Sequence, residues 1–478
     1  MENNTTLLRR DLLIRLLKIF FAEQDFTAID RIPVEMTPRN TESAIRCCIY
    51  RERAVTRSGI ISILGFDNSF DDEVRQLSSY ATESWQRPLV KYKQSNTSLL
   101  SVLQEGCSHC IRTNYIVTDA CRNCVARPCQ QNCPKEAISF RNNRAFIDPQ
   151  KCINCGICQK RCPFQAITYI PVPCEDVCPV EAIGKDEQGK VEIDFEKCIL
   201  CGKCMKACPF GAIFEKSQVI SVVKAMQSGK PVAAILAPAS AGQFPLAYGR
   251  LLGGLRSLGF ALIAEAAYGA DLTAAAEAEE WREMLASGKA MLTTSCCPSY
   301  LLAAQKHLPQ MQKYISQTPS PMSFTAEKIK QLHPEMITVF IGPCLAKKAE
   351  AAADANTDLV ISFEELGTML AAKNIQLQSA PESQPDFSGS KDGSGFAASG
   401  GVINALSSAL KSAELKPYRV DGINRKNLKL LKVFAAGKAP ANFIEVMACE
   451  GGCIAGPNNL NSCDLAARFF RKYQESLE

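Results

Sequence analysis

A cysteine-rich segment constrains this sequence more than any other feature. Residues 106–215 contain 16 of the chain's 24 cysteines. The motif Cys-Pro-x-x-Ala-Ile occurs four times in this segment, beginning at Cys133, Cys162, Cys178 and Cys208. Cysteines that recur at fixed spacings are held by disulfides or by metal, and the redox compartment decides between the two.

The start of the chain shows no secretory signal. Two arginines and an aspartate, residues 9–11, lie beside the first apolar run, and no small-residue cleavage site follows. That run, Leu12–Phe21, contains Arg15 and Lys18, so it is too short and too charged to cross a bilayer. No other segment predicts a membrane span. We therefore expect a cytoplasmic protein in which thiols stay reduced and the clustered cysteines bind metal.

Two segments resemble the cluster-binding run of bacterial ferredoxins. Cys152–Pro163 and Cys198–Pro209 both read Cys-x2-Cys-x2-Cys-x3-Cys-Pro. Two intervening residues allow a tight turn that presents successive sulfurs to one cluster, and the proline begins a short helix where its missing N–H is not needed. In this pattern three cysteines bind one 4Fe–4S cluster and the fourth binds its neighbour. Zinc is the alternative for four thiolates, but zinc modules do not repeat this run.

The ferredoxin pattern implies three complete ligand sets that cross over between half-modules. They are Cys152, Cys155 and Cys158 with Cys133; Cys121, Cys124 and Cys129 with Cys162; and Cys198, Cys201 and Cys204 with Cys178. Four residues precede Cys129 where the pattern has two, and we expect this to lengthen a loop without losing the ligand.

A fourth accessory cluster requires a less regular arrangement. Cys174 and Cys208 remain after the three sets are assigned, and Cys107 with Cys110 would complete a set of four. This grouping needs the first module, about residues 118–170, to be inserted in the second. The alternative is that Cys107 and Cys110 belong to a separate site or to none.

The rest of the chain divides into two regions on either side of the cysteine-rich segment. Residues 1–105 predict a small accessory domain of unknown role, with a buried helix at Leu7–Phe21 and a linker near Arg87–Ser98. In residues 216–478, Ala/Leu-rich helical segments alternate with short apolar strands such as Val232–Leu236 and Ile337–Ile341, which favours an α/β domain. A Ser/Gly/Pro-rich stretch, Ser379–Gly401, predicts a loop.

Three cysteine segments of this last region lie far apart in the sequence. They are Thr294–Pro298 (Thr-Ser-Cys-Cys-Pro), Pro343–Lys348 (Pro-Cys-Leu-Ala-Lys-Lys) and Met447–Cys453 (Met-Ala-Cys-Glu-Gly-Gly-Cys). A cofactor site assembled from remote loops needs a preformed fold. The three segments resemble, in order, the signature loops of FeFe hydrogenases, which hold the H-cluster: a 4Fe–4S cluster bridged through a cysteine sulfur to a two-iron unit carrying CO, cyanide and a dithiolate.

This resemblance implies an architecture and a set of site residues. The fold would be an α/β catalytic domain, with two twisted sheets flanked by helices and the H-cluster between them, preceded by α+β ferredoxin-like modules and the small N-terminal domain. Cys297, Cys344, Cys449 and Cys453 match the cluster ligands, with Cys453 bridging to the two-iron unit. Cys296 matches the proton-transfer cysteine, and Lys347 matches the lysine that donates to a cyanide. Pro238, Pro343 and Met447 match residues that line the two-iron pocket.

The resemblance also implies a proton relay. Glu277, Glu280 and Ser316 fall at the relay positions, and the two glutamates lie three residues apart on one helix face. The alternative for the glutamates is an ordinary solvated face, because Glu279 and Glu283 lie nearby. The family's surface arginine has no counterpart, since Met284 occupies its position.

Several departures indicate a divergent subgroup similar to group B hydrogenases. Tyr300 replaces a tryptophan, Gly342 stands where many members have a methionine beside the two-iron unit, and the last loop continues as Gly456-Pro457. None of these changes removes a ligand. Cys47, Cys48 and Cys463 lie outside every motif, and we expect them to be buried spectator thiols.

The resemblance implies an enzyme that interconverts H2 with two protons and two electrons. Ferredoxin or a similar small carrier would exchange electrons through the clusters, and dedicated maturases would build the two-iron unit. The alternatives are an H2 sensor, or an iron–sulfur assembly relative that lacks the two-iron unit.

The formal charge of +5 counts cluster ligands as neutral thiols, so the cluster-loaded protein would be acidic. The sequence contains no block of basic residues of the kind that would indicate nucleic-acid binding.

Overall fold

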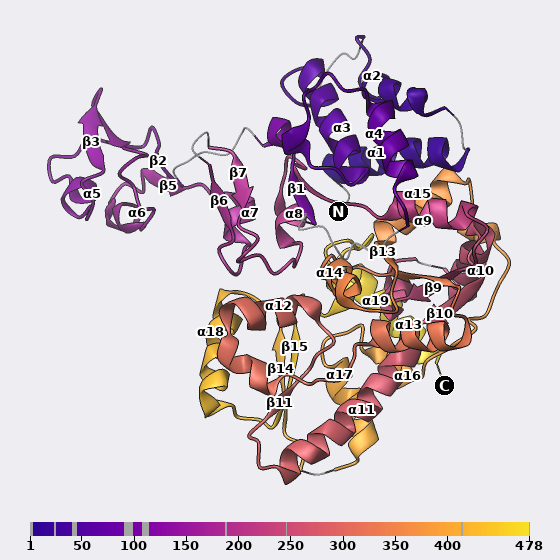
Figure 1. Cartoon of the computed structure of the whole chain (residues 1–478). Coiled ribbons are helices and arrows are strands. Elements are labelled where there is room, and N and C mark those ends of the chain that lie inside the picture. The colour runs from indigo at the N-terminus through magenta and orange to yellow at the C-terminus, as the bar shows by residue number, and fades with distance from the viewer. Residues whose placement is uncertain are drawn as a thin grey trace.

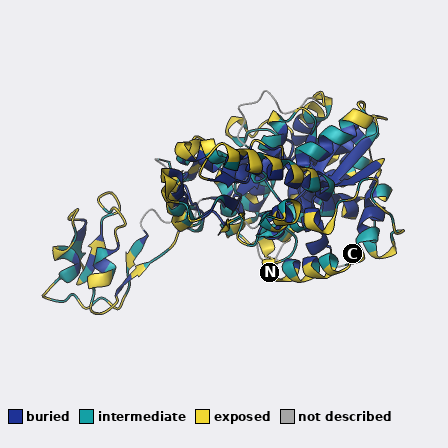
Figure 2. Cartoon of the chain, turned by 90° about the horizontal axis from the view of Figure 1, so that it is seen from below, coloured by how far each residue is buried: buried dark blue, intermediate teal, exposed yellow. Residues whose placement is uncertain are grey.

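The computed structural model describes residues 3–22, 25–40, 45–89, 99–107, 114–186, 189–244, 246–412 and 414–477. A helical N-terminal region, two small cysteine-rich modules and a larger α/β region follow one another along the chain (Figure 1). The first cysteine-rich module projects away from the rest of the molecule in both views (Figures 1 and 2). No described helix is long and apolar enough to cross a membrane.

The N-terminal region is helical. Its elements are α1 (Asn4–Phe21), η1 (Phe26–Arg31), α2 (Ile32–Met36), α3 (Ile49–Ile63), η2 (Asn68–Phe70) and α4 (Leu77–Gln86). The helix expected at Leu7–Phe21 is α1, which begins earlier because the Asn3 side chain accepts a hydrogen bond from the Thr6 amide at 2.9 Å. Leu12, Leu16 and Phe20 recur every four residues and are buried. Residues 90–98 of the expected linker lie outside the described residues.

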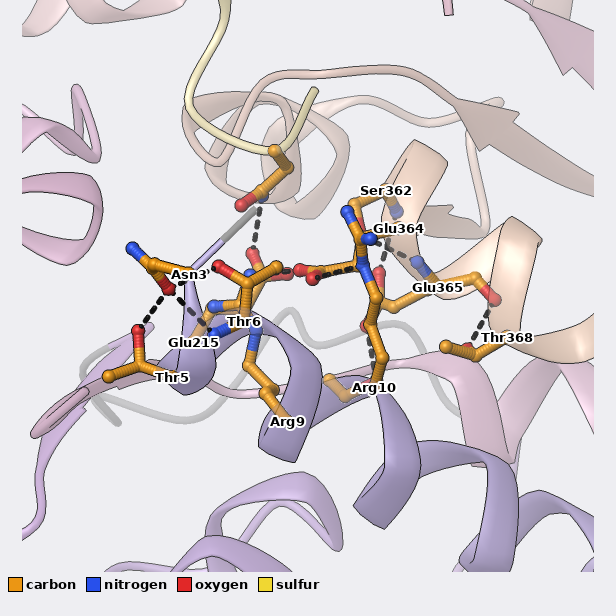
Figure 3. Close-up of polar contacts among 12 residues, drawn as sticks. Asn3, Thr5, Thr6, Arg9, Arg10, Glu215, Ser362, Glu364, Glu365 and Thr368 are labelled. Carbon is orange, nitrogen blue, oxygen red and sulfur yellow. Dashed lines mark hydrogen bonds and ion pairs between the residues drawn. The ribbon is translucent and has the colours of Figure 1, made fainter. Parts of the chain in front are cut away.

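A buried group of charged side chains attaches α1 to the α/β region (Figure 3). Arg9 and Arg10 both contact Glu364, with Arg10 Nε 3.1 Å from its Oε1. Beside them, Lys348 Nζ lies 3.4 Å from Glu215 Oε2 and 3.7 Å from Glu365 Oε1. The Glu364 side chain is only 4% exposed. The three regions of the chain therefore meet at a single set of ion pairs.

The two cysteine-rich modules have matching strand pairings, one nested inside the other. Their elements are β1 (Leu100–Val102), η3 (Gln104–Gly106), β2 (Tyr115–Val117), α5 (Pro128–Gln131), β3 (Ile138–Arg141), β4 (Arg144–Ile147), α6 (Ile157–Arg161), β5 (Ile167–Tyr169), α7 (Pro173–Asp176), β6 (Ile183–Lys185), β7 (Val191–Ile193), α8 (Lys203–Ala207) and β8 (Ile213–Glu215). The pairs β2–β5 and β3–β4 form the first module, while β1–β8 and β6–β7 form the second; all four are antiparallel. The second module thus has its first strand before the first module and its other strands after it.

The α/β region contains two parallel sheets. The first has the order β10–β9–β12–β13, with β9 (Val232–Leu236), β10 (Leu262–Glu265), β12 (Ile337–Ile341) and β13 (Leu359–Ile361). The second has the order β11–β15–β14, with β11 (Leu292–Thr293), β14 (Pro417–Asp421) and β15 (Phe443–Met447). Continuous apolar runs such as β9 are typical of strands buried on both faces, and every residue of β9 and β15 is buried, including Glu445 of β15. The strands expected at Val232–Leu236 and Ile337–Ile341 are β9 and β12.

Helices surround both sheets. They are α9 (Val219–Gln227), η4 (Pro238–Gly242), α10 (Tyr248–Leu258), α11 (Ala266–Ala286), α12 (Pro298–His307), η5 (Pro309–Tyr314), α13 (Pro321–Leu332), α14 (Ala346–Ala353), α15 (Phe363–Ala372), η6 (Leu377–Ser379), α16 (Lys391–Gly395), α17 (Gly401–Leu410), α18 (Arg425–Val433), η7 (Phe434–Lys438), η8 (Cys453–Ala455) and α19 (Cys463–Glu475). The expected α/β class is confirmed. The stretch Ser379–Gly401 is not wholly a loop, since it contains α16, which Ser390 caps and which packs against α11.

Four loops leave the carboxyl ends of these parallel strands. Pro238 follows β9, Cys296 and Cys297 follow β11, Cys344 follows β12, and Cys449 follows β15. Because the carboxyl ends of parallel strands meet at one edge of a sheet, such loops form the usual binding site of α/β proteins. The segments that carry the sequence motifs therefore converge where the two sheets meet.

Candidate active site and cluster-binding loops

A deep cavity lies between the loops of the two sheets. The space inside it that is open to the centre of a water molecule has a volume of about 90 Å³. Nine residues singled out from the sequence line it: Pro238, Cys296, Cys297, Pro343, Cys344, Lys347, Met447, Cys449 and Cys453. Most of the other lining residues are apolar, among them Phe340 and Phe396. A single water needs roughly 10–15 Å³ on the same measure, so the cavity has room for a group larger than one metal ion.

Local backbone structure fixes the positions of two of the lining cysteines, Cys297 and Cys453. Cys297 is the N-cap of α12, and Pro298 occupies the first helical position, where its missing N–H costs nothing. Cys453 begins the short helix η8, directly after Gly452. Gly452 has a φ of 88°, and a Cβ there would lie 2.6 Å from the Ser399 amide nitrogen. Only glycine fits this turn, which brings the last cysteine back to the cavity.

The chemistry of these thiols suits a cationic metal cluster. Burial raises the pKa of Cys344 and of Cys453 to about 12, and the neighbouring thiol of Cys297 contributes to both shifts. Burial also raises the pKa of Cys449 well above its ordinary value. Thiolates are the metal-binding form, so iron bound here would displace protons that burial otherwise retains. The four thiols together with the size of the cavity fit a cluster held by cysteine.

Lys347 brings a positive charge to the cavity wall. Its Nζ donates to Ser320 Oγ at 3.0 Å and to Glu350 Oε1 at 2.8 Å. The same ammonium lies 5.9 Å from the centre of the Phe340 ring. Burial by itself lowers the pKa of Lys347, but the charge and hydrogen bond of Glu350, with smaller contributions from the nearby thiols, outweigh this effect, so the pKa is raised. Lys347 is therefore a fixed cation beside the four thiols.

Phe340 occupies the space beside Gly342. A Cβ added at Gly342 would lie 2.6 Å from Phe340 Cε1 and 3.2 Å from Ala237 Cβ. The missing side chain at position 342 therefore leaves no empty channel, because the phenyl ring of Phe340 fills that side of the cavity. The sequence indicated a lost side chain at Gly342 but not its replacement, since Phe340 carries no motif.

Glu277 and Cys296 lie close together inside the protein. Glu277 is fully buried in α11, so the alternative of a solvated face is wrong for this residue. Burial raises the pKa of Glu277 to about 8, and Glu280 adds to the shift. Among the described residues no group makes a hydrogen bond of ordinary geometry to its carboxylate oxygens, but the Ser295 amide and the Ser316 hydroxyl lie near enough to oppose part of this rise in pKa. Burial raises the pKa of Cys296, and the next largest cause is the charge of Glu277.

Glu280 continues this group toward the surface. Its Oε2 accepts from Ser316 Oγ at 2.6 Å and from Thr318 Oγ1 at 3.1 Å. Ser316 is buried, whereas Glu280 is partly exposed and its Oε1 accepts from the amide of the exposed Gln317 at 3.0 Å. Met284 is buried at the position of the missing arginine. Glu280 therefore reaches solvent itself, without a further side chain. Thr318 is a member of this group that the sequence did not indicate.

The four Cys-Pro-x-x-Ala-Ile copies form the same turn. In each, the alanine amide donates to the cysteine Sγ four residues earlier, at 3.3, 3.3, 3.2 and 3.4 Å for Cys133, Cys162, Cys178 and Cys208. The residue before the alanine has a positive φ in all four copies: Glu136, Gln165, Glu181 and Gly211. The motif thus places an N–H at each cysteine, and such hydrogen bonds tune the potential of an iron–sulfur cluster.

The predicted ligand sets lie together as thiol groups. Burial raises the pKa of Cys158 to about 11, with Cys152, Cys155 and Cys133 as further causes. Burial likewise raises the pKa of Cys129, with contributions from Cys124 and Cys162. For Cys204, also raised mainly by burial, the contributing thiols are Cys201, Cys198, Cys178 and Cys174. Cys121 packs in the same apolar cluster as Cys129 and Cys162. No three His, Cys, Asp or Glu side chains among the described residues can hold a single metal ion.

The proposed fourth set is described only in part. Cys107 follows η3, and its pKa is raised by burial and by nearby Cys208. Cys174 packs in the same apolar cluster as Cys107 and Cys208. Cys110 lies outside the described residues, so its position relative to the other three is not shown.

The second module abuts the main cavity. Cys201 lines this cavity together with Cys449, and the Cys201 thiol contributes to the raised pKa of Cys449, which is caused mainly by burial. At the same junction, a Cβ on Gly202 would lie 2.7 Å from the ring of Pro457. The set that contains Cys201 is therefore next to the candidate active site.

Three cysteines contradict the sequence-based expectation. Cys47, Cys48 and Cys463 are exposed, not buried. The expectation was wrong because apolar character alone does not place a residue in the core; Cys48 caps α3 and Cys463 begins α19, both at the surface.

Known proteins resemble this chain over most of its length. The model of the family described as iron only hydrogenase large subunit, C-terminal domain, matches residues 230–457, and that of the 4Fe–4S binding domain matches residues 145–168 and 191–214. Iron hydrogenase 1 of Clostridium pasteurianum is 30% identical over 451 residues, which cover 81% of this chain and 78% of that protein. The periplasmic Fe hydrogenase large subunit of Nitratidesulfovibrio vulgaris is 29% identical over 65% of this chain and 85% of its own length.

Solved structures give a weaker match. A structure described as showing stepwise H-cluster assembly in an FeFe-hydrogenase covers 52% of this chain and 86% of its own, at 24% identity and a TM-score of 0.43. A TM-score at that level carries no weight beside the sequence relatives.

Proposed function

The chain belongs to the FeFe hydrogenase family of iron–sulfur oxidoreductases, whose cofactors are the H-cluster and 4Fe–4S clusters, and we propose that it catalyses the interconversion of H2 with two protons and two electrons. The observation that carries this proposal is the convergence of five cysteines and one lysine on a single apolar cavity. A fold that binds no cofactor here would not need to bring thiols from three remote loops to one cavity.

In this proposal Cys297, Cys344, Cys449 and Cys453 would hold the H-cluster, and Cys453 would be the ligand shared with the two-iron unit. When bound, that unit supplies the site at which protons and electrons combine. Lys347 is held by Glu350 and Ser320, so its ammonium presents a fixed charge to an anionic ligand. Pro238, Pro343 and Met447 exclude water from the same cavity.

Protons travel between solvent and Cys296 through the residues of α11 and its neighbours. Glu280 exchanges protons with solvent, Ser316 relays them, and Glu277 passes them to the Cys296 thiol. A buried carboxyl with a pKa near neutral is suited to transfer in both directions, because neither protonation state is strongly disfavoured. Replacing Glu277 with Gln should therefore abolish most turnover while leaving the iron content unchanged. Glu279→Gln is the control, since Glu279 is exposed and pairs with Arg282.

Electrons reach the cavity through the cysteine-rich modules. We assign residues 1–105 to an N-terminal accessory domain, residues 106–215 to the ferredoxin-like region and residues 216–478 to the catalytic domain, although β1 shows that strand pairing of the second module begins at Leu100. The nested strand pairs support insertion of the first module in the second. The group at Cys198, Cys201, Cys204 and Cys178 is the proximal cluster, because Cys201 adjoins Cys449.

Four accessory clusters follow if Cys107, Cys110, Cys174 and Cys208 form the last set. Iron counting on anaerobically reconstituted protein tests this number. Four clusters predict about sixteen iron atoms in the ferredoxin-like region, whereas about twelve would exclude the fourth cluster.

The electron partner is an acidic small carrier of the ferredoxin kind that docks on the first module. Residues 114–170 contain eight lysines and arginines but only three aspartates and glutamates. Five of these cations are exposed and form no ion pair among the described residues: Arg122, Lys135, Lys151, Lys160 and Arg161. Turnover with an acidic ferredoxin should fall steeply with added salt, whereas turnover with a viologen dye should not. Equal salt dependence would contradict this docking site.

Two further assignments belong to the same proposal. Dedicated maturases supply the two-iron unit, as the family resemblance implies. The cytoplasm is the location, because a chain with this many cluster thiols needs a reducing environment during assembly.

Infrared spectroscopy provides the decisive experiment. After loading with a synthetic two-iron cofactor, the protein should show CO and cyanide bands together with H2 turnover. Absence of these bands would contradict the proposal and favour an assembly relative. Bands with very slow turnover would favour an H2 sensor, although Cys296, the residue that such a sensor typically alters, is present.

A further inference from the structure

Two adjacent cysteines that belong to no cluster group lie exposed at the start of helix α3. The Sγ atoms of Cys47 and Cys48 are 3.9 Å apart. Cys48 is the N-cap of the helix, with an extended backbone (φ −165°, ψ 163°). Adjacent exposed thiols in contact are unlike the other groups, whose cysteines come from separate turns and are mostly buried or half-buried.

The surroundings of the pair favour reactive thiolates. Arg51 Nη1 lies 3.8 Å from Cys47 Sγ. The backbone amide of Arg51 is the main cause that lowers the pKa of Cys48, and Cys47 and the Arg51 side chain contribute. Cysteines that react with oxidants lie in such electropositive, solvent-accessible places. Cys463 differs, because it is exposed but has no hydrogen bond to a cation or a second thiol in the described parts of the chain.

The pair lies at the seam between the N-terminal helices and the second cysteine-rich module. Arg51 Nε donates to the carbonyl of Glu105 at 2.7 Å, and Glu105 lies two residues before Cys107. Arg46 Nη2 donates to the carbonyl of Phe210 at 2.9 Å, and Phe210 lies two residues after Cys208. The two arginines that flank the thiols therefore contact the segments that carry Cys107 and Cys208, two members of the proposed fourth set.

We propose that Cys47 and Cys48 are a redox-active dithiol in electronic contact with the cluster chain. The pair closes when it is oxidised to a disulfide and opens when that disulfide is reduced. On closing, a small-molecule disulfide takes two electrons from the pair: one Cys47–Cys48 sulfur–sulfur bond forms, and two thiol molecules are released. On opening, one H2 supplies two electrons through the clusters and two protons to the medium. The sulfur–sulfur bond breaks, and each cysteine takes up one electron and one proton.

The covalent geometry makes this bond easy to reduce. Adjacent Cα atoms lie about 3.8 Å apart across a trans peptide. Ordinary disulfides join Cα atoms that are about 4.4–6.8 Å apart. A bridge between neighbours is therefore strained, and strained, exposed disulfides are the labile and regulatory ones. The opening step rests on the proposed hydrogenase function, whereas the closing step does not.

Anaerobic oxidation of the cluster-loaded protein tests the proposal. The protein is treated with glutathione disulfide, freed of small molecules and divided between H2 and argon. Free thiols are then alkylated, and the peptides are mapped by mass spectrometry. The peptide with Cys47 and Cys48 should lose both alkylation sites and be lighter by two hydrogen atoms under argon, and should regain both sites under H2.

Variants and a second assay separate the possible outcomes. Cys47→Ser should abolish the internal bond, whereas Cys463→Ser should leave the result unchanged. Failure of the pair to form the bond would overturn the proposal, as would a bond that persists under H2 in a sample that reduces a viologen dye with H2. A sample that forms the bond but does not reduce the viologen dye supports the closing step and contradicts the proposed hydrogenase function instead.

Discussion

Burial decides the chemistry of Glu277 more than its sequence neighbours do. Glu279 and Glu283 on the same helix are exposed, whereas Glu277 points into the protein because α11 packs against α13, α16 and α17. Desolvation disfavours the carboxylate, so the folded-state pKa of about 8 lies above the ordinary value of 4.5. Below about pH 8 the side chain is therefore mainly the neutral acid.

This protonation state predicts an infrared signal. The carbonyl stretch of a buried carboxylic acid should be present at neutral pH and should disappear as the pH rises through about 8. Glu277→Gln should remove the signal, and Glu279→Gln should retain it. A signal that is already absent at neutral pH in the unaltered protein would show that Glu277 is ionised and that its burial is compensated by a cation or a water.

Phe340 and Gly342 form a matched pair at the cavity wall. A methyl group at position 342 would overlap the Phe340 ring, so Gly342→Ala should destabilise the protein by roughly 1–3 kcal/mol and lower its thermal unfolding midpoint. The double variant with Phe340→Leu should recover most of this loss. Gly184→Ala is the control, because a Cβ there meets no atom within 4 Å. An unchanged midpoint for Gly342→Ala would show that Phe340 moves freely.

At the scale of elements, the Cys-Pro-x-x-Ala-Ile turn depends on one left-handed residue. Gln165 has a φ of 50°, a conformation that costs a β-branched residue roughly 1–3 kcal/mol. Gln165→Val should therefore reduce the iron content of the first module, because the amide of Ala166 can no longer reach Cys162 without strain. Gln165→Gly is the matched control and should retain full iron content. Equal iron content in both variants would contradict this account.

The length of an element limits what its sequence can predict. The strands β9 and β12 were predicted at their observed bounds, because each is a short, largely apolar run with proline or glycine close to both ends or directly after it, as is typical of a buried parallel strand. The short helix α16 was missed, since its sequence, Lys391–Gly395, contains two glycines and no periodic pattern. Its stability comes from packing against α11, which lies more than a hundred residues earlier.

For the whole molecule, the ion pairs of Figure 3 attach the N-terminal helices to the α/β region. Glu364→Gln leaves Arg9 and Arg10 without their shared carboxylate. We expect this to destabilise the protein by roughly 2–3 kcal/mol, less than for a fully buried pair because the arginine side chains remain 20% and 19% exposed. The urea midpoint of unfolding measures the change.

A surface ion pair provides the comparison for this prediction. Glu83 contacts Arg75 and Arg87, but its side chain is 47% exposed, so Glu83→Gln should cost less than about 1 kcal/mol. Equal shifts of the urea midpoint for the two variants would show that the buried cluster does not hold the N-terminal helices.

The sequence by itself determined the features that depend on local spacing. Cysteine intervals of two and three residues define the ligand runs, because a short turn can present its sulfurs in few ways. Apolar runs define the central strands, and the three remote motifs define the family. Each run or motif is itself a short stretch of neighbouring residues, although the three motifs lie far apart.

Only the tertiary structure decided the features that depend on remote contacts. The burial of Glu277, the exposure of Cys47 and Cys48, and the Phe340 ring beside Gly342 each arise where distant segments pack together. The same is true of Arg9 and Glu364, which lie 355 residues apart. A side chain's pKa and reactivity depart from their ordinary values through desolvation and through neighbouring groups, and both are set only when the chain has folded.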